Sequence, residues 1–414
     1  MRLDNLFLRL LSLAGKFLLA LYMGRYLSLS AIGVYGLVFS AVQILGVLLG
    51  QELNFVVCRE IVPLDPKACL IRMRDQAALY GVNYLALVVA MTICVMLRST
   101  EISPKILYYT TTLAILESFC TVTQFNLNAR QKQLAASWLF VVRTSAWALP
   151  VVAIGILNPS LRTMDSILIG WIIGGIVCLA GTIWVWRDLP WSSVVSLPID
   201  WRWIRSCIKK THLVWLGMIS LTVGGFGERF VVEHVLTIED VGIVTFYFSF
   251  TNALLVFAQS AVLVFSTPRL ITYHAEADSK SFRQEALYAV THTAFGCALL
   301  AACIGIGVTG LAYLLGRHAI LVAIGTFWLM LGGAWLRVNA EALKSVIYAR
   351  HQDRAIWLGD LLFVVPAVGF NLIFVPWFGL PGVGYSAIAA SFLLLIWRYM
   401  HLSDILRIPV DRDR

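Results

Sequence analysis

Two basic residues within long apolar stretches have the types and positions best suited to chemistry. Lys16 lies near the middle of one such stretch, and Arg143 lies inside another. An ionisable group at the centre of a bilayer costs about 2.5–3.5 kcal/mol on insertion scales, so it should face a partner or a watery cavity. Ammonium and guanidinium groups both bind phosphate oxygens. Lys16 and Arg143 therefore predict a site for an anion such as a diphosphate.

The residues before Lys16 extend this cationic character along one helical face. Arg9, Ser12 and Lys16 are spaced by three and then four residues, which stacks them on the same side of a helix. We interpret this face as a diphosphate-binding stripe. The structural alternative is that Arg9 reaches the membrane interface and Lys16 pairs with a neighbouring acid.

A second polar face follows the apolar stretch at 104–126. Its residues are spaced by four, three and four, which predicts a polar stripe over about three helical turns: Glu117, Thr121, Gln124 and Asn128. Such a face should line the interior and not face lipid. The alternative is that these side chains only join helices through hydrogen bonds and ion pairs.

The second half of the chain carries a corresponding face of mixed charge. An internal offset of about 220 residues aligns the first stripe with Arg337, Glu341 and Lys344. Asp360 lies on the next apolar stretch, and both it and Glu117 are possible partners for Arg143. Glu52 is interpreted either as a gate or cation site or as an interfacial acid paired with Arg59.

The elements that hold these residues are membrane-spanning helices. The sequence is 59% hydrophobic and 13% charged, with a mean hydropathy of +0.81, more apolar surface than a water-soluble core can hide. Stretches of about 20 apolar residues match the thickness of a bilayer. The predicted spans are 6–27, 31–56, 76–97, 104–126, 134–157, 164–187, 208–228, 239–266, 285–313, 318–338, 354–376 and 380–402.

The distribution of charge predicts how these spans are oriented. About 23 of the 32 Lys and Arg residues fall on the side of the two termini. By the positive-inside rule both termini are predicted to be cytoplasmic.

The eight Cys residues form no C-x-x-C pair, so neither a disulfide framework nor a metal site is predicted. The glycine pairs Gly46/Gly50 and Gly170/Gly174 are interpreted as close helix contacts.

The chain also repeats itself, which predicts two bundles of six helices. Gly33 in Ser30–Ser40 aligns with Gly242 in Glu239–Ser249 at an offset of roughly 209 residues. An even number of spans per copy makes this a parallel repeat, with a cleft expected between the bundles. The predicted divisions are an N-terminal bundle at 1–190, a cytoplasmic linker at 191–207 and a C-terminal bundle at 208–414, the linker being either a hinge or an ordinary loop.

At this point the chain resembles a known family of transporters. The resemblance rests on soft motifs and on the twofold repeat: Leu13–Lys16, Gly24–Ser28, Ile32–Tyr35, Glu228–Phe230 and Val241–Ile243. The sequence is similar to bacterial Wzx-type oligosaccharide flippases of the multidrug/oligosaccharidyl-lipid/polysaccharide (MOP, MATE-like) exporter superfamily. It has Glu228 where an Asp often precedes the Arg.

The resemblance implies a flippase of the inner membrane. Such a protein carries undecaprenyl-diphosphate-linked oligosaccharide units across the membrane by alternating access, for O-antigen, capsule or exopolysaccharide. The motifs add Arg25 to the substrate residues and Glu228 and Arg229 to those for coupling or gating. Implied partners are membrane lipids, a polysaccharide polymerase, a chain-length regulator and H⁺ or Na⁺. No cofactor, catalytic residue or nucleic-acid partner is expected.

Two other functions compete with this interpretation. A drug or cation antiporter of the same superfamily should have an anionic cavity, whereas Lys16 and Arg143 are cationic. A membrane glycan polymerase or ligase, which would be an enzyme, should have a large catalytic loop outside the membrane, but every predicted outer loop is short.

Overall fold

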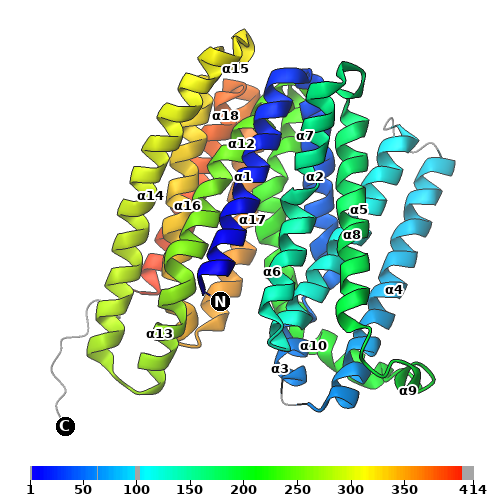
Figure 1. Ribbon diagram of the computed structural model, residues 1–414. Coiled ribbons are helices and arrows are strands. Elements are labelled where there is room, and N and C mark those ends of the chain that lie inside the picture. The colour runs from blue at the N-terminus through cyan, green and yellow to red at the C-terminus, as the bar shows by residue number, and fades with distance from the viewer. Residues whose placement is uncertain (1, 63, 98–102, 403–414) are drawn as a thin grey trace. The chain divides into compact units, whose positions relative to one another are not determined.

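The computed structural model describes residues 2–62, 64–97 and 103–402, and within these ranges every regular element is a helix. The first half contains α1 (Arg2–Tyr26), α2 (Leu29–Gly50), α3 (Asn54–Ile61), α4 (Pro66–Met96), α5 (Pro104–Ala129), α6 (Gln133–Val141), η1 (Val142–Ala146), α7 (Ala148–Leu157), η2 (Pro159–Leu161), α8 (Met164–Trp186) and α9 (Ser192–Val195). The second contains α10 (Trp201–Phe226), α11 (Glu228–Val235), α12 (Ile238–Phe257), η3 (Ala258–Leu263), α13 (Val264–Ala275), α14 (Ser279–Leu315), α15 (His318–Val322), α16 (Ile324–Ala349), α17 (Asp353–Phe378) and α18 (Pro381–Met400). Figure 1 shows their arrangement.

Each predicted span falls on a long helical segment. Among the described residues, eight segments are long and apolar enough to cross a membrane. The other four predicted spans lie on α1, α5, α10 and α16, because polar side chains lower the mean hydropathy of these helices. Three of these four, α1, α5 and α16, carry candidate site residues such as Lys16, Glu117 and Arg337. The chain is therefore an all-α polytopic membrane protein with polar side chains on several of its long helices.

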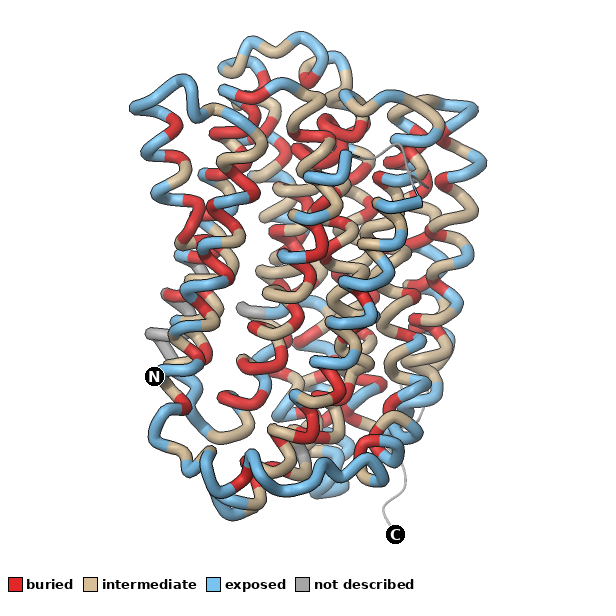
Figure 2. Tube along the Cα trace, turned by 90° about the vertical axis from the view of Figure 1, so that its right-hand side faces the viewer, coloured by how far each residue is buried: buried red, intermediate tan, exposed pale blue. Residues whose placement is uncertain are grey.

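The outer surfaces of the helices fit a lipid environment. Large apolar residues such as Leu85 on α4 and Phe295 and Leu314 on α14 are exposed. Figure 2 shows exposed and buried residues interleaved along the long helices. Exposed large apolar side chains along long helices fit a membrane contact.

Two predicted spans contain breaks that the hydropathy pattern did not reveal. The stretch 31–56 is interrupted after Gly50, where Gln51 and Glu52 have positive φ values of 46° and 48°. The stretch 134–157 contains the π-helical turn η1. Pro150 has no N–H to bond the carbonyl of Ala146, the last residue of η1, and such a missing bond widens or kinks a helix.

The contacts divide the chain into two compact units, which we describe separately. Unit 1 comprises 1–27 and 37–222, and unit 2 comprises 28–36 and 223–414. The first turns of α2 therefore belong with unit 2, and most of α10 belongs with unit 1. The division at 1–190, 191–207 and 208–414 stays a prediction about the sequence repeat.

Unit 2 contains a reciprocal contact between residues related by the repeat. A Cβ on Gly33 would lie 2.1 Å from the carbonyl oxygen of Ile238, and one on Gly242 would lie 2.1 Å from that of Leu29. The offset of 209 residues pairs Gly33 with Gly242 and Leu29 with Ile238. Each glycine thus contacts the residue that lies four positions before the other glycine. Only glycine permits such a close backbone approach, which explains why both copies carry it.

Packing within each unit joins helices that are not consecutive in the chain. In unit 1, α1 lies against α6, η1 and α7, while α5 packs on α8. In unit 2, α16 packs against α18, α14 and α12, and Figure 1 shows α14, α16 and α18 side by side. A buried apolar cluster in unit 1 joins α3, α4, α5 and α10 through residues such as Leu53, Val57, Leu127 and Cys207.

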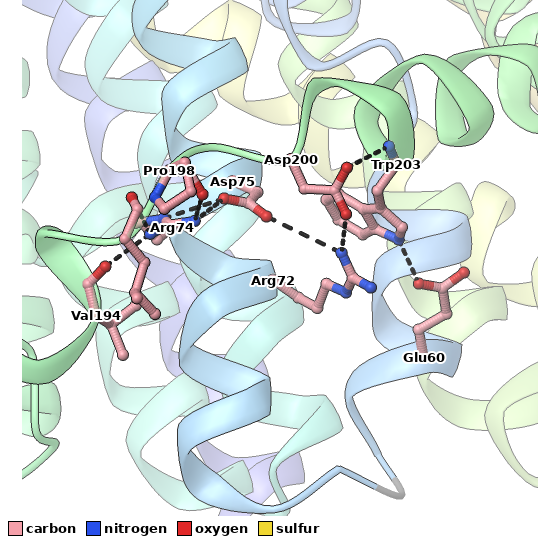
Figure 3. A network of polar contacts seen from close by, with 9 residues as sticks. Glu60, Arg72, Arg74, Asp75, Val194, Pro198, Asp200 and Trp203 are labelled. Carbon is pink, nitrogen blue, oxygen red and sulfur yellow. Dashed lines mark hydrogen bonds and ion pairs between the residues drawn. The ribbon is translucent and has the colours of Figure 1, made fainter.

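The connector after α8 is fixed to α4 by two arginines (Figure 3). Arg74 donates to the carbonyl oxygens of Val194 and Leu197 at 2.6 and 2.7 Å, and it pairs with the fully buried Asp75 at 2.5 Å. Arg72 pairs with Asp200 at 3.2 Å. The first part of the predicted linker is therefore held against unit 1 rather than free.

Asp200 starts α10 and is stabilised in its ionised form. Its side chain accepts a hydrogen bond from the Trp203 backbone N–H at 3.0 Å, and this bond, with Arg72, holds the pKa of Asp200 below its ordinary value. A side-chain oxygen at this position satisfies a backbone donor of the first helical turn. The Trp203 indole N–H in turn donates to Glu60 at 2.7 Å.

We predict that Arg74→Ala destabilises the purified protein much more than Arg72→Ala does. Removing Arg74 leaves the carboxylate of Asp75 buried with a weak partner, a situation that costs about 3–5 kcal/mol. The Arg72–Asp200 pair is exposed and contributes about 1 kcal/mol or less. Thermal unfolding in detergent measures both, and equal shifts in Tm would contradict the assignment of Arg74 as the main partner.

Candidate functional site

Lys16 is positioned by a close contact between α1 and η1 in unit 1. A Cβ on Gly15 would lie 2.8 Å from Cβ of Ser145, so the two backbones approach closely at this point. One turn earlier, the hydroxyls of Ser12 and Thr144 form a hydrogen bond of 2.7 Å. The small residues and the hydroxyl pair fix the face of α1 on which Lys16 lies.

The Lys16 side chain is exposed and has a cationic neighbour. No ion pair or hydrogen bond of its ammonium group is found in the described part of the chain. Arg143 and Glu117 are the charged groups that act on it electrostatically. Lys16 and Arg143 therefore share the carboxylate of Glu117.

Arg143 lies in the π-helical turn η1 and reaches toward α5. Its Nε lies 3.4 Å from Oε2 of Glu117, and its guanidinium also donates to the hydroxyl of Thr121. The other oxygen of Glu117 accepts a hydrogen bond of 2.8 Å from the Trp171 indole. Of the two partners considered for Arg143, the structure thus gives Glu117.

The aromatic support of Glu117 depends on two glycines of α8. Trp171 stacks on Trp147 with ring centroids 6.1 Å apart and planes 10° apart. A Cβ on Gly174 would lie 2.7 Å from the Trp147 ring, and one on Gly170 would lie 2.2 Å from Val151. The predicted close helix approach at Gly170 and Gly174 is confirmed.

Arg143, Glu117 and Thr121 line a cavity of about 170 Å³ within unit 1. Glu52, in the break between α2 and α3, lies in the same lining. Polar side chains of Gln43 and Asn54 complete its wall. The cavity therefore brings together two predicted substrate residues, Arg143 and Thr121, and two acids predicted for coupling or gating, Glu117 and Glu52.

The interpretation of Gly46 and Gly50 as helix contacts is wrong. No atom would lie within 4 Å of a Cβ built on either glycine, and both line the cavity. Here the missing side chains leave open space beside Arg143 instead of drawing two helices together.

Five of the seven predicted substrate residues are absent from the lining of this cavity: Lys16, Ser12 and Arg25 on α1, and Gln124 and Asn128 on α5. Gln124 and Asn128 follow Thr121 on α5 but are absent from the lining, and Asn128 is exposed. Arg25 is exposed in the last turn of α1, nine residues or about 14 Å along the helix from Lys16. The interior part of the α5 stripe is therefore Glu117 and Thr121.

Unit 2 holds a buried ion-pair network at the corresponding helices. Asp360 on α17 pairs with Lys344 at 2.6 Å and with Arg398 at 2.6 Å. Arg398 also pairs with Glu341 at 2.9 Å, and its side chain is 1% exposed. These ion pairs join two carboxylates to two cations, and Arg337 acts on the same carboxylates from nearby. Asp360 thus pairs with Lys344 and Arg398 within unit 2 and not with Arg143, the partner considered from the sequence.

Glu228, Arg229 and Arg337 lie deeper than their positions near the ends of the spans suggested. Arg229 is fully buried, with its guanidinium carbon 4.1 Å from the centre of the Phe248 ring. It does not extend to the membrane interface. Glu228 and Arg337 line a second cavity of about 70 Å³, with Arg337 over the Phe363 ring at 5.1 Å.

Some participants were not identified from sequence. Arg398 lies inside the predicted span 380–402 but was not chosen as a candidate, yet it pairs with both Glu341 and Asp360 in the unit 2 network. Its position within the span 380–402 was the available signal. Trp171 and Thr144 gave no polar signal of their own. Across the described residues, no group of three or more His, Cys, Asp or Glu side chains could hold a metal ion.

No protein-family model matches the chain, and no curated protein matches it significantly. Solved structures do. The chain is similar to an inward-facing multidrug resistance MATE family transporter of the MOP superfamily, with a TM-score of 0.76 and 15% identity over 99% of this chain and 100% of that one. An outward-facing structure of such a transporter gives a TM-score of 0.67 at 15% identity, covering 99% and 96%. A MATE complex with MaD3S gives 0.67 at 16% identity, covering 98% and 96%.

These similarities define the class of the fold. The chain has the fold of MATE transporters over its full length, with two bundles of helices. Identities of 15–16% show the fold and nothing finer. The predicted fold class is confirmed.

We predict that Asp360→Ala destabilises the protein by about 3–5 kcal/mol, because it leaves the buried guanidinium of Arg398 with only Glu341. Lys344→Ala should cost less, about 1–3 kcal/mol, because Arg398 still pairs with Asp360. Thermal unfolding of the two purified variants in detergent compares them. A smaller loss for Asp360→Ala than for Lys344→Ala would show that Asp360 is not the central acid.

Proposed function

We propose that the protein is a flippase of the bacterial inner membrane. It translocates undecaprenyl-diphosphate-linked oligosaccharide units by alternating access, with both termini in the cytoplasm. The units would serve the synthesis of a surface polysaccharide such as O-antigen, capsule or exopolysaccharide. The observation that carries the proposal is the exposed side chain of Lys16, which shares the carboxylate of Glu117 with Arg143.

The two cations Lys16 and Arg143 support an anionic cargo. A diphosphate cannot cross hydrocarbon with its charge unpaired, because desolvation costs far more than thermal energy. Lys16 and Arg143 would replace part of its water shell. The compact ammonium of Lys16 allows release, and the forked guanidinium of Arg143 can bind two phosphate oxygens once it leaves Glu117.

The polar wall beside these cations supports the rest of the cargo. The cavity of about 170 Å³ suits a phosphate-sized group and not a whole oligosaccharide. We assign the sugars to the polar face of α5, including Thr121, Gln124 and Asn128, with Ser12 and Arg25 on α1 as further contacts. The polyprenyl tail would stay in lipid.

Net direction requires a source of free energy. We propose either removal of the product by a polysaccharide polymerase with its chain-length regulator, or coupling to H⁺ or Na⁺. Glu117, Glu52, Glu228 and Asp360 are the acids available for coupling, with Arg229, Arg337 and Glu341 as their charged neighbours. Movement of one bundle against the other would provide alternating access.

A cation antiporter is the second candidate, and one observation favours it. In unit 2, Oε1 of Glu228 is buried without a hydrogen-bond partner and lines the second cavity. An unpaired buried carboxylate attracts a proton or a metal cation. The same group could instead couple a flippase to an ion gradient.

We predict that Lys16→Ala and Arg143→Ala each reduce translocation of a lipid-diphosphate oligosaccharide in proteoliposomes by roughly ten- to hundredfold. This range follows from losing a charged hydrogen bond of about 1.5–3 kcal/mol. Lys16→Arg should retain part of the rate because it keeps the charge. Lys209→Ala is the matched control, since Lys209 is an exposed lysine at the start of α10.

The contrary result is unimpaired translocation by Lys16→Ala at a normal level of folded protein. That outcome would reject the assignment of Lys16 to the diphosphate. Formation of glycosidic bonds by the purified protein in the same liposomes would instead favour an enzyme.

A separate measurement distinguishes the antiporter. If the protein exports cations, everted vesicles should expel a cationic dye when a proton or sodium gradient is applied, and Glu228→Gln should abolish this. We expect no such export from the wild-type protein. Gradient-dependent export that Glu228→Gln removes, with no flipping of lipid-linked sugar, would replace the flippase proposal.

A further inference from the structure

Unit 1 contains a larger cavity that the proposed transport site does not use. It has a volume of about 610 Å³ and is formed by α4, α5 and α8, with Trp191 beside α9 at one end. This volume falls within the range of about 300–1,000 Å³ typical of ligand pockets. Residues at its edge, Ala77 and Gly81 on α4 and Ile183 on α8, are exposed, so the cavity opens between these two helices.

The walls change in character from one end to the other. Toward the middle of the helices they carry Gly81, Tyr84 and Phe119. Toward the end of α5 and α8 they carry Asn126, Trp186 and Arg187. The cavity is thus apolar at its inner end and polar at the end that the spans place near the membrane interface.

Three buried polar atoms in this lining have no hydrogen-bond partner. They are Oδ1 of Asn126, Oγ1 of Thr182 and Nε1 of Trp186, on residues that are 4–5% exposed. An unsatisfied buried donor or acceptor costs about 1–3 kcal/mol, so such groups are normally paired. A ligand with ester carbonyl and hydroxyl groups would satisfy all three.

Positive charge lies beside the same end. Arg187 belongs to the lining, and its ion pair with Asp188, at 3.5 Å, is exposed on both sides and therefore weak. The ammonium of Lys132 lies 4.9 Å from the centre of the Trp186 ring. Two cations next to the polar end favour an anionic headgroup.

We propose that this cavity is a binding site for an anionic glycerophospholipid. One acyl chain occupies the inner end along Gly81 and Phe119. The ester and glycerol groups bond to Trp186, Thr182 and Asn126, and the phosphate lies near Arg187 and Lys132. The site is separate from the proposed transport site and holds whether or not the protein is a flippase.

Gly81 offers a direct test because no atom would lie within 4 Å of a Cβ at this position. Gly81→Phe should fill the cavity, and Gly81→Ala is the matched control, which removes a helix-interior glycine and should be at least as stable. The proteins are reconstituted in vesicles of equimolar phosphatidylglycerol and phosphatidylcholine and then repurified. The lipids that they retain are identified and quantified by mass spectrometry. We expect wild type and Gly81→Ala to retain phosphatidylglycerol preferentially, and Gly81→Phe to retain roughly tenfold less.

A second measurement does not depend on the folding of Gly81→Phe. Brominated phosphatidylglycerol should quench tryptophan fluorescence of the wild-type protein more than brominated phosphatidylcholine does. The excess should disappear in Trp186→Phe. Equal retention of the two lipids, undiminished retention by a folded Gly81→Phe, quenching unaffected by Trp186→Phe, or a polyprenyl phosphate as the retained lipid would each overturn the proposal.

Discussion

The constraint on which this structure depends is that a charge placed inside a membrane span must have a partner or reach water. The two units meet it differently. In unit 2, Asp360 and Glu341 form ion pairs with Lys344 and Arg398 at 2.6–2.9 Å. In unit 1, Glu117 acts on both Arg143 and Lys16, and the exposed Lys16 side chain forms no ion pair with the described residues. Ion-paired groups stabilise the contacts between helices, whereas an exposed cation without an ion pair is available to a ligand.

Local helix distortions put these charges in place. The π turn η1 carries Arg143 and is followed by Pro150, whose missing N–H leaves a carbonyl of that turn without its helical bond. Unit 2 has a similar arrangement, where Pro268 follows η3 in α13. A π turn adds a residue to the helix and turns the following side chains to another face. In unit 1 this device allows Arg143 to reach Glu117 on α5.

The sequence predicted the spans and the polar stripes, because each depends on spacing along one helix. It predicted the repeat because two distant segments of the chain resemble each other. The polar stripe on α5 brought Glu117 and Thr121 to the interior, but Gln124 and Asn128 lie beyond the cavity. The sequence could not predict contacts that depend on neighbouring helices. Arg398 lies near the end of a predicted span, and its partner Asp360 lies on another helix. The break at Gln51 and Glu52 was not visible in the hydropathy.

Glycines show most clearly why spacing alone was insufficient. Gly170 and Gly174 share the four-residue spacing of Gly46 and Gly50, yet the first pair contacts Val151 and Trp147 while the second faces open space. A missing side chain can therefore either join two helices or leave a cavity between them, and only the neighbours decide. Where a cavity also contains buried polar atoms without partners, as around Trp186, the chain does not supply all of their hydrogen bonds. Water or a ligand must then supply the missing bonds, and an apolar inner end next to lipid favours the ligand.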